Sequence, residues 1–125
     1  MGIYLNPDNI DFQEALNSKI YVDKTGLIKY TNDVIRTEDK YVCVNRPRRF
    51  GKSIAANMFV AYYSRGCDSR QMFSGYKIAD DPSFEKHLNK YNVIHVNMVN
   101  FISEGKTVQE GLDYLCRRLI HELKQ

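Results

Sequence analysis

The residues of this chain that are best suited to chemistry lie in one basic stretch near its middle. Within it, Gly51, Lys52 and Ser53 form the tripeptide that ends a phosphate-binding loop. In such a loop a glycine lets the backbone approach a phosphate, a lysine neutralises the β and γ phosphates, and a serine hydroxyl helps to hold Mg²⁺. The sequence therefore predicts a site for ATP with Mg²⁺, in which Ser53 is a metal ligand. The predicted nucleotide-binding residues are Arg46, Pro47, Arg48, Arg49, Phe50, Gly51, Lys52 and Ser53.

The predicted loop departs from the usual pattern G-x-x-x-x-G-K-[ST] at its first position, where Arg46 replaces glycine. A side chain there excludes backbone conformations reserved for glycine and places a bulky cation at the mouth of the loop. A bare G-K-[ST] tripeptide also occurs by chance in roughly one chain in ten or twenty of this length. The interpretation as a phosphate loop therefore depends on the elements around it.

A phosphate loop requires a strand before it and a helix after it, and the sequence predicts both. Residues 41–44 are a continuous run of β-forming residues, which is typical of a strand covered on both faces. After Lys52, apolar residues recur with the helical period until Arg65 and Gly66, which predict the end of that helix. This order favours phosphate binding over a solvated basic turn, which is the alternative interpretation of the stretch.

The remaining pattern predicts an α/β fold. Strands linked through helical crossovers indicate a P-loop NTPase-like unit of three layers with parallel strands. Two strands are fewer than the about four to six of a stable open sheet, so we expect an incomplete sheet in a truncated chain. The other predicted elements are a short helix within residues 1–20, a helix over 23–35 capped by Asp23, a short helix over 82–88, a strand over 92–99 and a helix from about residue 106.

The whole chain, residues 1–125, is interpreted as the N-terminal portion of one such domain. Residues 1–38 are expected to form a helical segment, and residues 39–125 the incomplete α/β core. The last predicted helix is still in register at Gln125 and lacks a Gly or Pro stop signal, so we expect more of the sheet to follow in a longer protein.

Three segments of the chain resemble a known family. They are Y-V-D-K-T-G-L-I over 21–28, R-P-R-R-F-G-K-S over 46–53 and A-Y-Y-S-R-G-C-D-S over 61–69. The chain resembles the AAA-ATPase-like proteins of gut and anaerobic bacteria, which are predicted ATPases of the P-loop superfamily. That family writes its phosphate loop as R-P-R-R-F-G-K-S, so the resemblance implies that Arg46 is a family trait. It also implies that Asp23 and Lys24 line the nucleotide site; a helix cap and a surface charge are the alternative interpretations.

The sequence leaves ATP hydrolysis open. In related ATPases an acidic residue ends a strand beyond the loop and its helix, but here Asn97 follows the apolar residues 93–96. An amide cannot act as a carboxylate base. The resemblance implies that the full-length protein is an ATPase, whereas this chain contains no recognisable acid of that kind.

Two further functions fit the same residues. A nucleic-acid-binding module would use Arg48 and Arg49 against phosphates of the backbone, although the net charge of +3 gives it little support. A regulator that binds nucleotide without hydrolysing it would order a surface for a protein partner. The oligomeric state has no signal in the sequence.

The cysteines and histidines predict neither a disulfide framework nor a metal site. Cys43, Cys67 and Cys116 are odd in number and widely spaced, and no histidine has a second ligand at metal spacing. No apolar run approaches the ~20 residues of a membrane span, and the N-terminus does not resemble a signal peptide. We therefore expect a cytoplasmic protein with no membrane association, and the family resemblance implies a bacterial one.

Overall fold

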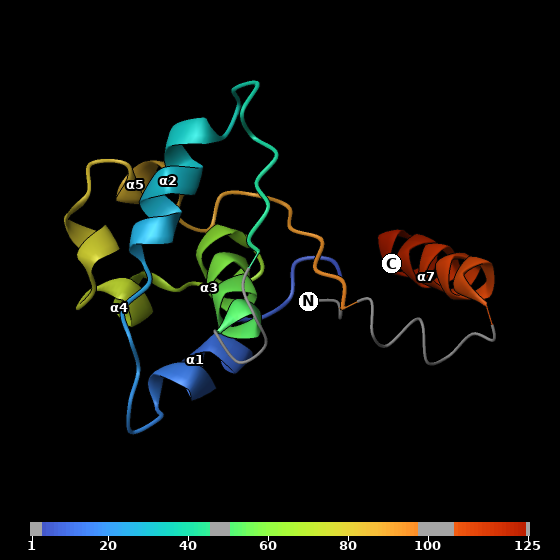
Figure 1. The fold of residues 1–125 in the computed structure, drawn as a ribbon, viewed down its shortest axis with the longest axis horizontal. Helices are drawn as coiled ribbons and strands as arrows, with labels where there is room; N and C mark the ends of the chain where they lie inside the picture. The colour runs from blue at the N-terminus through green and yellow to red at the C-terminus, as the bar shows by residue number, and fades with distance from the viewer. Residues whose placement is uncertain (1–3, 46–50, 98–106, 125) are drawn as a thin grey trace.

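The computed structural model describes residues 4–45, 51–97 and 107–124, and its regular elements there are all helical (Figure 1). Helix α3 lies among the shorter helices, and α7 stands apart from them in Figure 1. In chain order the elements are α1 (Ile10–Leu16), α2 (Gly26–Val34), α3 (Lys52–Tyr63), α4 (Arg70–Phe73), the 3₁₀ helix η1 (Lys77–Asp80), α5 (Phe84–His87) and α7 (Val108–Leu123).

The hydrophobic core forms around α3, because this helix places apolar side chains at helical spacing toward its neighbours. Met58, Ala61 and Tyr62 are almost completely buried. Phe73 stacks on Phe12 at 5.4 Å between ring centroids and meets Tyr62 edge to face at 5.7 Å. Aromatic pairs of this geometry stabilise a core beyond their buried area. The other members of the core cluster are Ile28, Ile78, Phe84 and Leu88.

A buried polar network fastens α2 to α3 and α5. Asn32 on α2 donates to the Tyr62 hydroxyl at 3.1 Å and to Ser83 Oγ at 3.0 Å. The Tyr63 hydroxyl donates to Asn32 Oδ1 at 2.6 Å, and the Tyr62 hydroxyl donates to the Phe84 carbonyl at 2.8 Å. Burial raises the pKa of Tyr62 to about 12, and it also raises the pKa of Tyr63. Both phenols therefore stay protonated donors well above neutral pH. Satisfied buried groups of this kind fix the relative positions of the helices that carry them.

Asn89 closes the C-terminal end of α3. Its side-chain amide donates to the carbonyls of Ala61 at 3.0 Å and Ser64 at 2.7 Å, and its backbone N–H donates to Tyr62 O at 2.6 Å. Its side-chain oxygen Oδ1 accepts from Ser69 N at 2.9 Å. Asn89 has φ 54°, a left-handed conformation that asparagine tolerates better than most residues. One residue thus binds the carbonyls that the end of a helix leaves without intrahelical partners.

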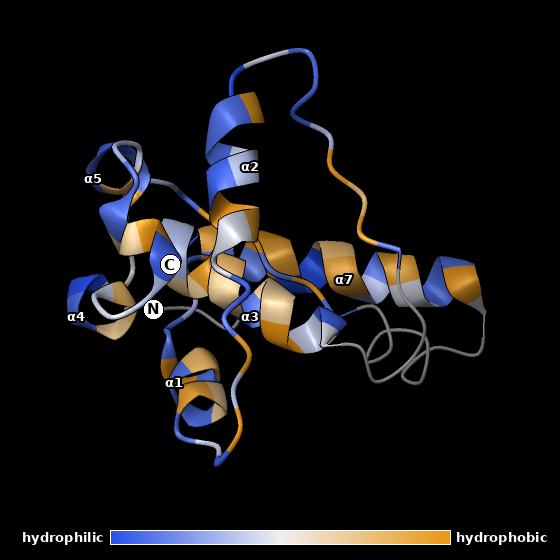
Figure 2. Cartoon of the chain, turned by 60° about the vertical axis from the view of Figure 1, so that its left-hand side comes forward, coloured by the Kyte–Doolittle hydropathy of each residue, from blue (hydrophilic) through white to orange (hydrophobic). Residues whose placement is uncertain are grey.

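The predicted α/β fold with parallel strands is wrong for the part of the chain that the structure describes, which contains no strand. Segment 41–45 is extended but forms no ladder there, and Tyr41 is 86% exposed instead of buried. The middle of this segment, residues 42–44, is apolar, and Figure 2 shows an orange stretch in the segment that follows α2. A pattern of β-forming residues reports side-chain preference, whereas a strand also requires a neighbouring segment that shares its backbone hydrogen bonds.

The second predicted strand, residues 92–99, is wrong for the same reason over the residues described. Between 92 and 97 it makes one isolated antiparallel bridge, from Ile94 to Leu5. The N–H of Asn6 donates to Val93 O at 2.7 Å, so this segment binds the start of the chain and no second strand. Residues 98 and 99 lie outside the described residues.

Several predicted helices are present with altered limits. The helix expected over 23–35 begins at Gly26, and the helix that follows Lys52 ends at Tyr63, just before the predicted stop. The last helix is α7, whose apolar residues Val108, Ile120 and Leu123 are more than half exposed. Its Glu122 carboxylate accepts from the N–H groups of Tyr4 and Leu5.

Within the described ranges, no helix combines the length and the apolar character needed to cross a bilayer.

Candidate functional site

The start of α3 carries the part of the predicted phosphate loop that the structure describes. Gly51 is the N-cap residue with φ 82° and ψ 23°, and Lys52 is the first residue of the helix. Ser53 is exposed in the first turn, which contains no acidic residue. Residues with a side chain rarely adopt the Gly51 conformation, so the glycine is required by the turn into the helix. The five predicted loop residues that precede it, 46–50, lie outside the described residues.

A cleft of about 360 Å³ opens beside this turn, and we call it the lysine cleft. It collects three lysines from three different elements: Lys24 from the segment before α2, Lys52 from α3 and Lys77 from η1. Among the described residues, this lining contains three lysines and one acidic residue, Asp23, and the excess of positive side chains gives the cleft a positive potential. The lining residues are Asp23, Lys24, Gly26, Leu27, Val44, Gly51, Lys52, Ala55 and Lys77.

Asp23 organises one wall of the lysine cleft through its own hydrogen bonds. Its carboxylate accepts from Thr25 N at 2.9 Å, from Thr25 Oγ1 at 2.6 Å and from Lys77 N at 3.0 Å. Thr25 is completely buried and its hydroxyl oxygen accepts from Ile78 N at 3.2 Å. Burial raises the pKa of Asp23, but the hydrogen bonds from Thr25 and Lys77 outweigh it, so the pKa lies below its ordinary value. The charged carboxylate of Asp23 therefore connects the N-cap residue of α2 to η1.

Lys24 reaches from this wall to Gly51. Its ammonium nitrogen lies 2.5 Å from the position that a Cβ on Gly51 would occupy. The absence of a side chain at Gly51 thus permits two things: the left-handed backbone conformation and the close approach of the Lys24 ammonium. Lys24 and Gly51 also line a further cavity of about 380 Å³, together with Tyr21 and Ile54.

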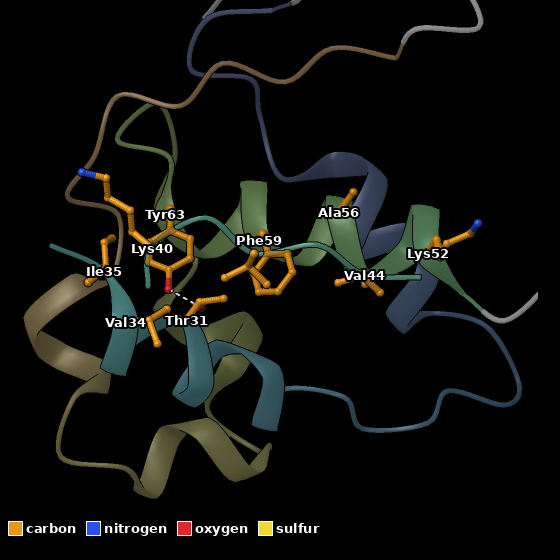
Figure 3. A pocket seen from close by; sticks show the side chains of 11 residues that line it. Thr31, Val34, Ile35, Lys40, Val44, Lys52, Ala56, Phe59 and Tyr63 are labelled. Atoms are coloured by element: carbon orange, nitrogen blue, oxygen red, sulfur yellow. Dashed lines mark hydrogen bonds between the residues drawn. The ribbon is translucent and has the colours of Figure 1, made fainter. Parts of the chain in front are cut away.

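A larger cavity of about 440 Å³ lies between α2, residues 40–44 and the side of α3 (Figure 3). Its walls are mainly apolar, with Val34, Val44 and Phe59 among them. Figure 3 shows Lys52 at one end, with its ammonium directed away from the other lining side chains, and the Tyr63 hydroxyl turned toward Thr31. This apolar cavity and the lysine cleft have three lining residues in common, Val44, Lys52 and Ala55, of which Lys52 is the charged one.

The structure brings several predicted site residues together. Gly51 and Lys52 line the lysine cleft with Asp23 and Lys24. That these residues bind a nucleotide stays a prediction. Ser53 lies next to them along α3, but is not part of the cleft lining. The cap interpretation of Asp23 is wrong, since the N-cap residue of α2 is Thr25; the Asp23 carboxylate binds the Thr25 N–H before the helix begins.

Lys77 is a site residue that the sequence does not reveal. It lies 25 positions after Lys52 in a short 3₁₀ helix, and its place in the cleft follows from the bonds of Asp23 to Lys77 N and of Thr25 to Ile78 N. Those contacts join distant segments, so no periodicity or spacing signals them.

Residues of the types that bind metals are not grouped in the described ranges, where no set of three or more His, Cys, Asp or Glu residues could hold an ion. The His87 ring nitrogen is hydrogen-bonded to the Tyr91 hydroxyl at 2.6 Å, a structural role. Burial lowers the pKa of His87, and the charges of Arg36 and Lys86 act in the same direction.

Comparison with known proteins gives one match. A model of the AAA-ATPase-like family, described as a predicted AAA-ATPase, matches residues 10–125. No curated protein and no solved structure matches the chain. The matched range includes the basic loop, the lysine cleft and α7.

Proposed function

This chain belongs to the AAA-ATPase-like family, and from this premise we propose that it binds ATP at the N-terminal end of α3. The observation that carries the proposal is the left-handed turn at Gly51, which leads directly into Lys52 and a helix of 12 residues beside a cleft lined by lysines. The residues Arg46 to Phe50 are proposed to complete the loop around the phosphates.

The electrostatics of this end of α3 favour a polyphosphate. The N-terminus of a helix carries about half a positive charge, and its first N–H groups have no intrahelical acceptor. Lys52 adds a full charge at the same place, and the first turn contains no acidic residue that would compete with an anion. Helix N-termini with such surroundings are common binding sites for phosphate groups.

Mg²⁺ is proposed to bind together with ATP. The Ser53 hydroxyl is exposed in the first turn of α3, so it fits the role of the one protein ligand that accompanies phosphate oxygens. When bound, the ion neutralises charge on the β and γ phosphates. The protein's own contribution there is the hydroxyl oxygen of Ser53.

Hydrolysis is proposed for the full-length protein, not for the described residues alone. Asp23 is the one carboxylate that the described residues contribute to the lining of the lysine cleft, and its oxygens already accept from Thr25 and Lys77. A carboxylate occupied in this way is poorly placed to accept a proton from water. Nucleotide binding that orders a surface for a protein partner is therefore retained as the alternative role.

The test is calorimetric titration of the chain with ATP and Mg²⁺. We expect Lys52→Ala to weaken binding about 100-fold or more, which corresponds to about 2.8 kcal/mol, because it removes a charge-assisted contact to phosphate. Lys86→Ala is the matched control, since it removes one lysine from α5, away from the lysine cleft. Both variants should retain the helical circular dichroism of the unaltered chain.

Two results would count against the proposal. Equal ATP affinity of Lys52→Ala and the unaltered chain would exclude the start of α3 as the site. Binding of an oligonucleotide that falls steeply with salt, and that depends on Arg48 and Arg49 more than on Lys52, would instead support a nucleic-acid-binding module.

A further inference from the structure

We propose that the side chain of Lys77 binds the phosphate chain of ATP from η1, while Lys52 binds it from α3. The inference rests on the proposed function and adds a residue that lies outside the three segments of family resemblance. It makes the lysine cleft a phosphate site formed by two elements that are distant in the sequence.

The position of Lys77 in the fold supports this assignment. Lys77 is the first residue of η1, and it lines the lysine cleft together with Gly51 and Lys52 at the start of α3. Lys77 is exposed, whereas the next residue, Ile78, is 1% exposed and belongs to the hydrophobic core. The buried Ile78 side chain fixes η1 against the core, so the packing of the fold holds Lys77 at the cleft.

Two hydrogen bonds hold the backbone at this point. The N–H of Lys77 donates to Asp23 Oδ2 at 3.0 Å, and the N–H of Ile78 donates to the hydroxyl of the buried Thr25 at 3.2 Å. Both bonds use the backbone of η1 and do not involve the Lys77 side chain. A side chain on a fixed backbone loses less conformational freedom when it engages a ligand. Structure and ligand binding are therefore assigned to different parts of the same residue.

The charge of Lys77 lies near the cleft wall without forming an ion pair in the described part of the chain. Burial raises the pKa of Asp23, but hydrogen bonds from Thr25 and from Lys77 N lower it, and the Lys77 charge lowers it further. The ammonium is thus close enough to act on a carboxylate of the cleft lining. The ion pairs within the described ranges join other residues. Lys77 therefore combines a position close to the cleft wall with the ability to bind an anion.

Two lysines on different elements fit a chain of phosphates. Lys52 lies at the N-terminal end of α3, where the helix dipole also favours an anion. A triphosphate carries several negative charges along its length, so Lys77 can contact one phosphate while Lys52 contacts another. An anion between two cations also removes their mutual repulsion. The bound phosphate chain is consequently expected to link η1 to α3.

The experiment compares Lys77→Gln with Lys86→Gln, which removes the same charge from α5, by titration with ATP and with inorganic triphosphate. We expect Lys77→Gln to weaken both ligands about 10-fold, because it removes a charge-assisted contact to phosphate. It should also reduce the dependence of the affinity on salt concentration. Lys77→Arg should recover part of the affinity because it restores the charge. Lys86→Gln should behave as the unaltered chain.

Melting temperatures separate this role from a structural one. Lys77→Gln keeps both backbone hydrogen bonds of η1, so its melting temperature should equal that of the unaltered chain. A lower melting temperature with unchanged affinity for ATP and triphosphate would give Lys77 a structural role and overturn the inference. An equal loss of affinity in Lys86→Gln would indicate a general effect of charge and would also overturn it.

The same titrations distinguish failure of the inference from failure of the proposed function. If the unaltered chain does not bind ATP, both are overturned. If Lys52→Ala weakens ATP binding and Lys77→Gln does not, the function stands and Lys77 is excluded. If Lys77→Gln weakens the binding of ATP but not of inorganic triphosphate, Lys77 contacts the nucleoside and the inference is wrong.

Discussion

The two ends of α3 are in opposite surroundings. At the C-terminal end, Asn89 and Tyr91 bind the carbonyls of four consecutive residues, 61–64. At the N-terminal end, Gly51 supplies no side-chain cap, and the lysine cleft lies beside the first turn. The fold uses the hydrogen-bonding groups of one end for its own structure, and it surrounds the other end with cations.

This difference separates stability from function along a single helix. Groups that bind carbonyls at the end of a helix contribute to folding, because those carbonyls would otherwise lose their hydrogen bonds on burial. Cations at the N-terminal end are unfavourable next to the helix dipole, which carries positive charge at that end. Their presence is therefore better explained by an anionic ligand than by stability of the helix.

The largest expected effect is at the C-terminal end. Asn89→Ala removes side-chain hydrogen bonds to Ala61, Ser64 and Ser69 and a longer one to Cys67 Sγ at 3.7 Å. The first three should lower the free energy of unfolding by about 3 kcal/mol, at about 1 kcal/mol each. Urea unfolding measures this change in the free energy of unfolding. Asn89→Gly is the control for backbone strain, because it keeps the left-handed conformation and loses the same bonds. The ATP affinity of the folded fraction should not change. A large change would contradict the view that the C-terminal end of α3 contributes to stability alone.

An intermediate effect is expected at the turn itself. Gly51→Ala places a side chain in a left-handed conformation, which costs about 1 to 2 kcal/mol, and its Cβ meets the Lys24 ammonium. Thermal unfolding should show the loss of stability, and titration should show weaker ATP binding. In a Lys24→Ala background the steric part of the cost should vanish while the backbone part remains. An equal cost in both backgrounds would contradict the contact between Lys24 and Gly51.

The smallest expected effect has the opposite sign. Ser53→Asp places a negative charge in the first turn of α3, near the helix dipole and the lysines, and should raise the free energy of unfolding by about 0.5 kcal/mol. The same carboxylate should prevent ATP binding, because it repels the phosphates. Ser53→Asn has a similar shape without the charge and serves as the control. Undiminished ATP binding by Ser53→Asp would show that the anion binds elsewhere.

The sequence predicted the helical elements best. The apolar period after Lys52 predicted α3, and Arg65 and Gly66 predicted its end to within a few residues. Helix patterns succeed because neighbours along a helix are close in sequence. Membership of the family was also predictable, from three motifs that all lie within the residues matched by the family model.

The sheet could not be predicted from the same kind of pattern. Residues 41–44 have the side chains of a buried strand, yet Tyr41 is 86% exposed and the described residues supply no partner strand. Pairing depends on another segment, and an apolar run contains no information about its position. Lys77 was missed for a related reason, since only the long-range bonds of Asp23 and Thr25 bring η1 to the cleft.

Asp23 joins segments that lie 54 positions apart in the chain. Closing so long a loop costs conformational entropy before its contacts offset that cost, so the junction is expected to form after the local helices during folding. Lys24 belongs to that junction, and partly opened forms of the protein would hold the start of α3 without it. Under the proposed function, closure and ATP binding are linked equilibria, and ATP should slow hydrogen exchange of the Lys77 amide, which donates to Asp23.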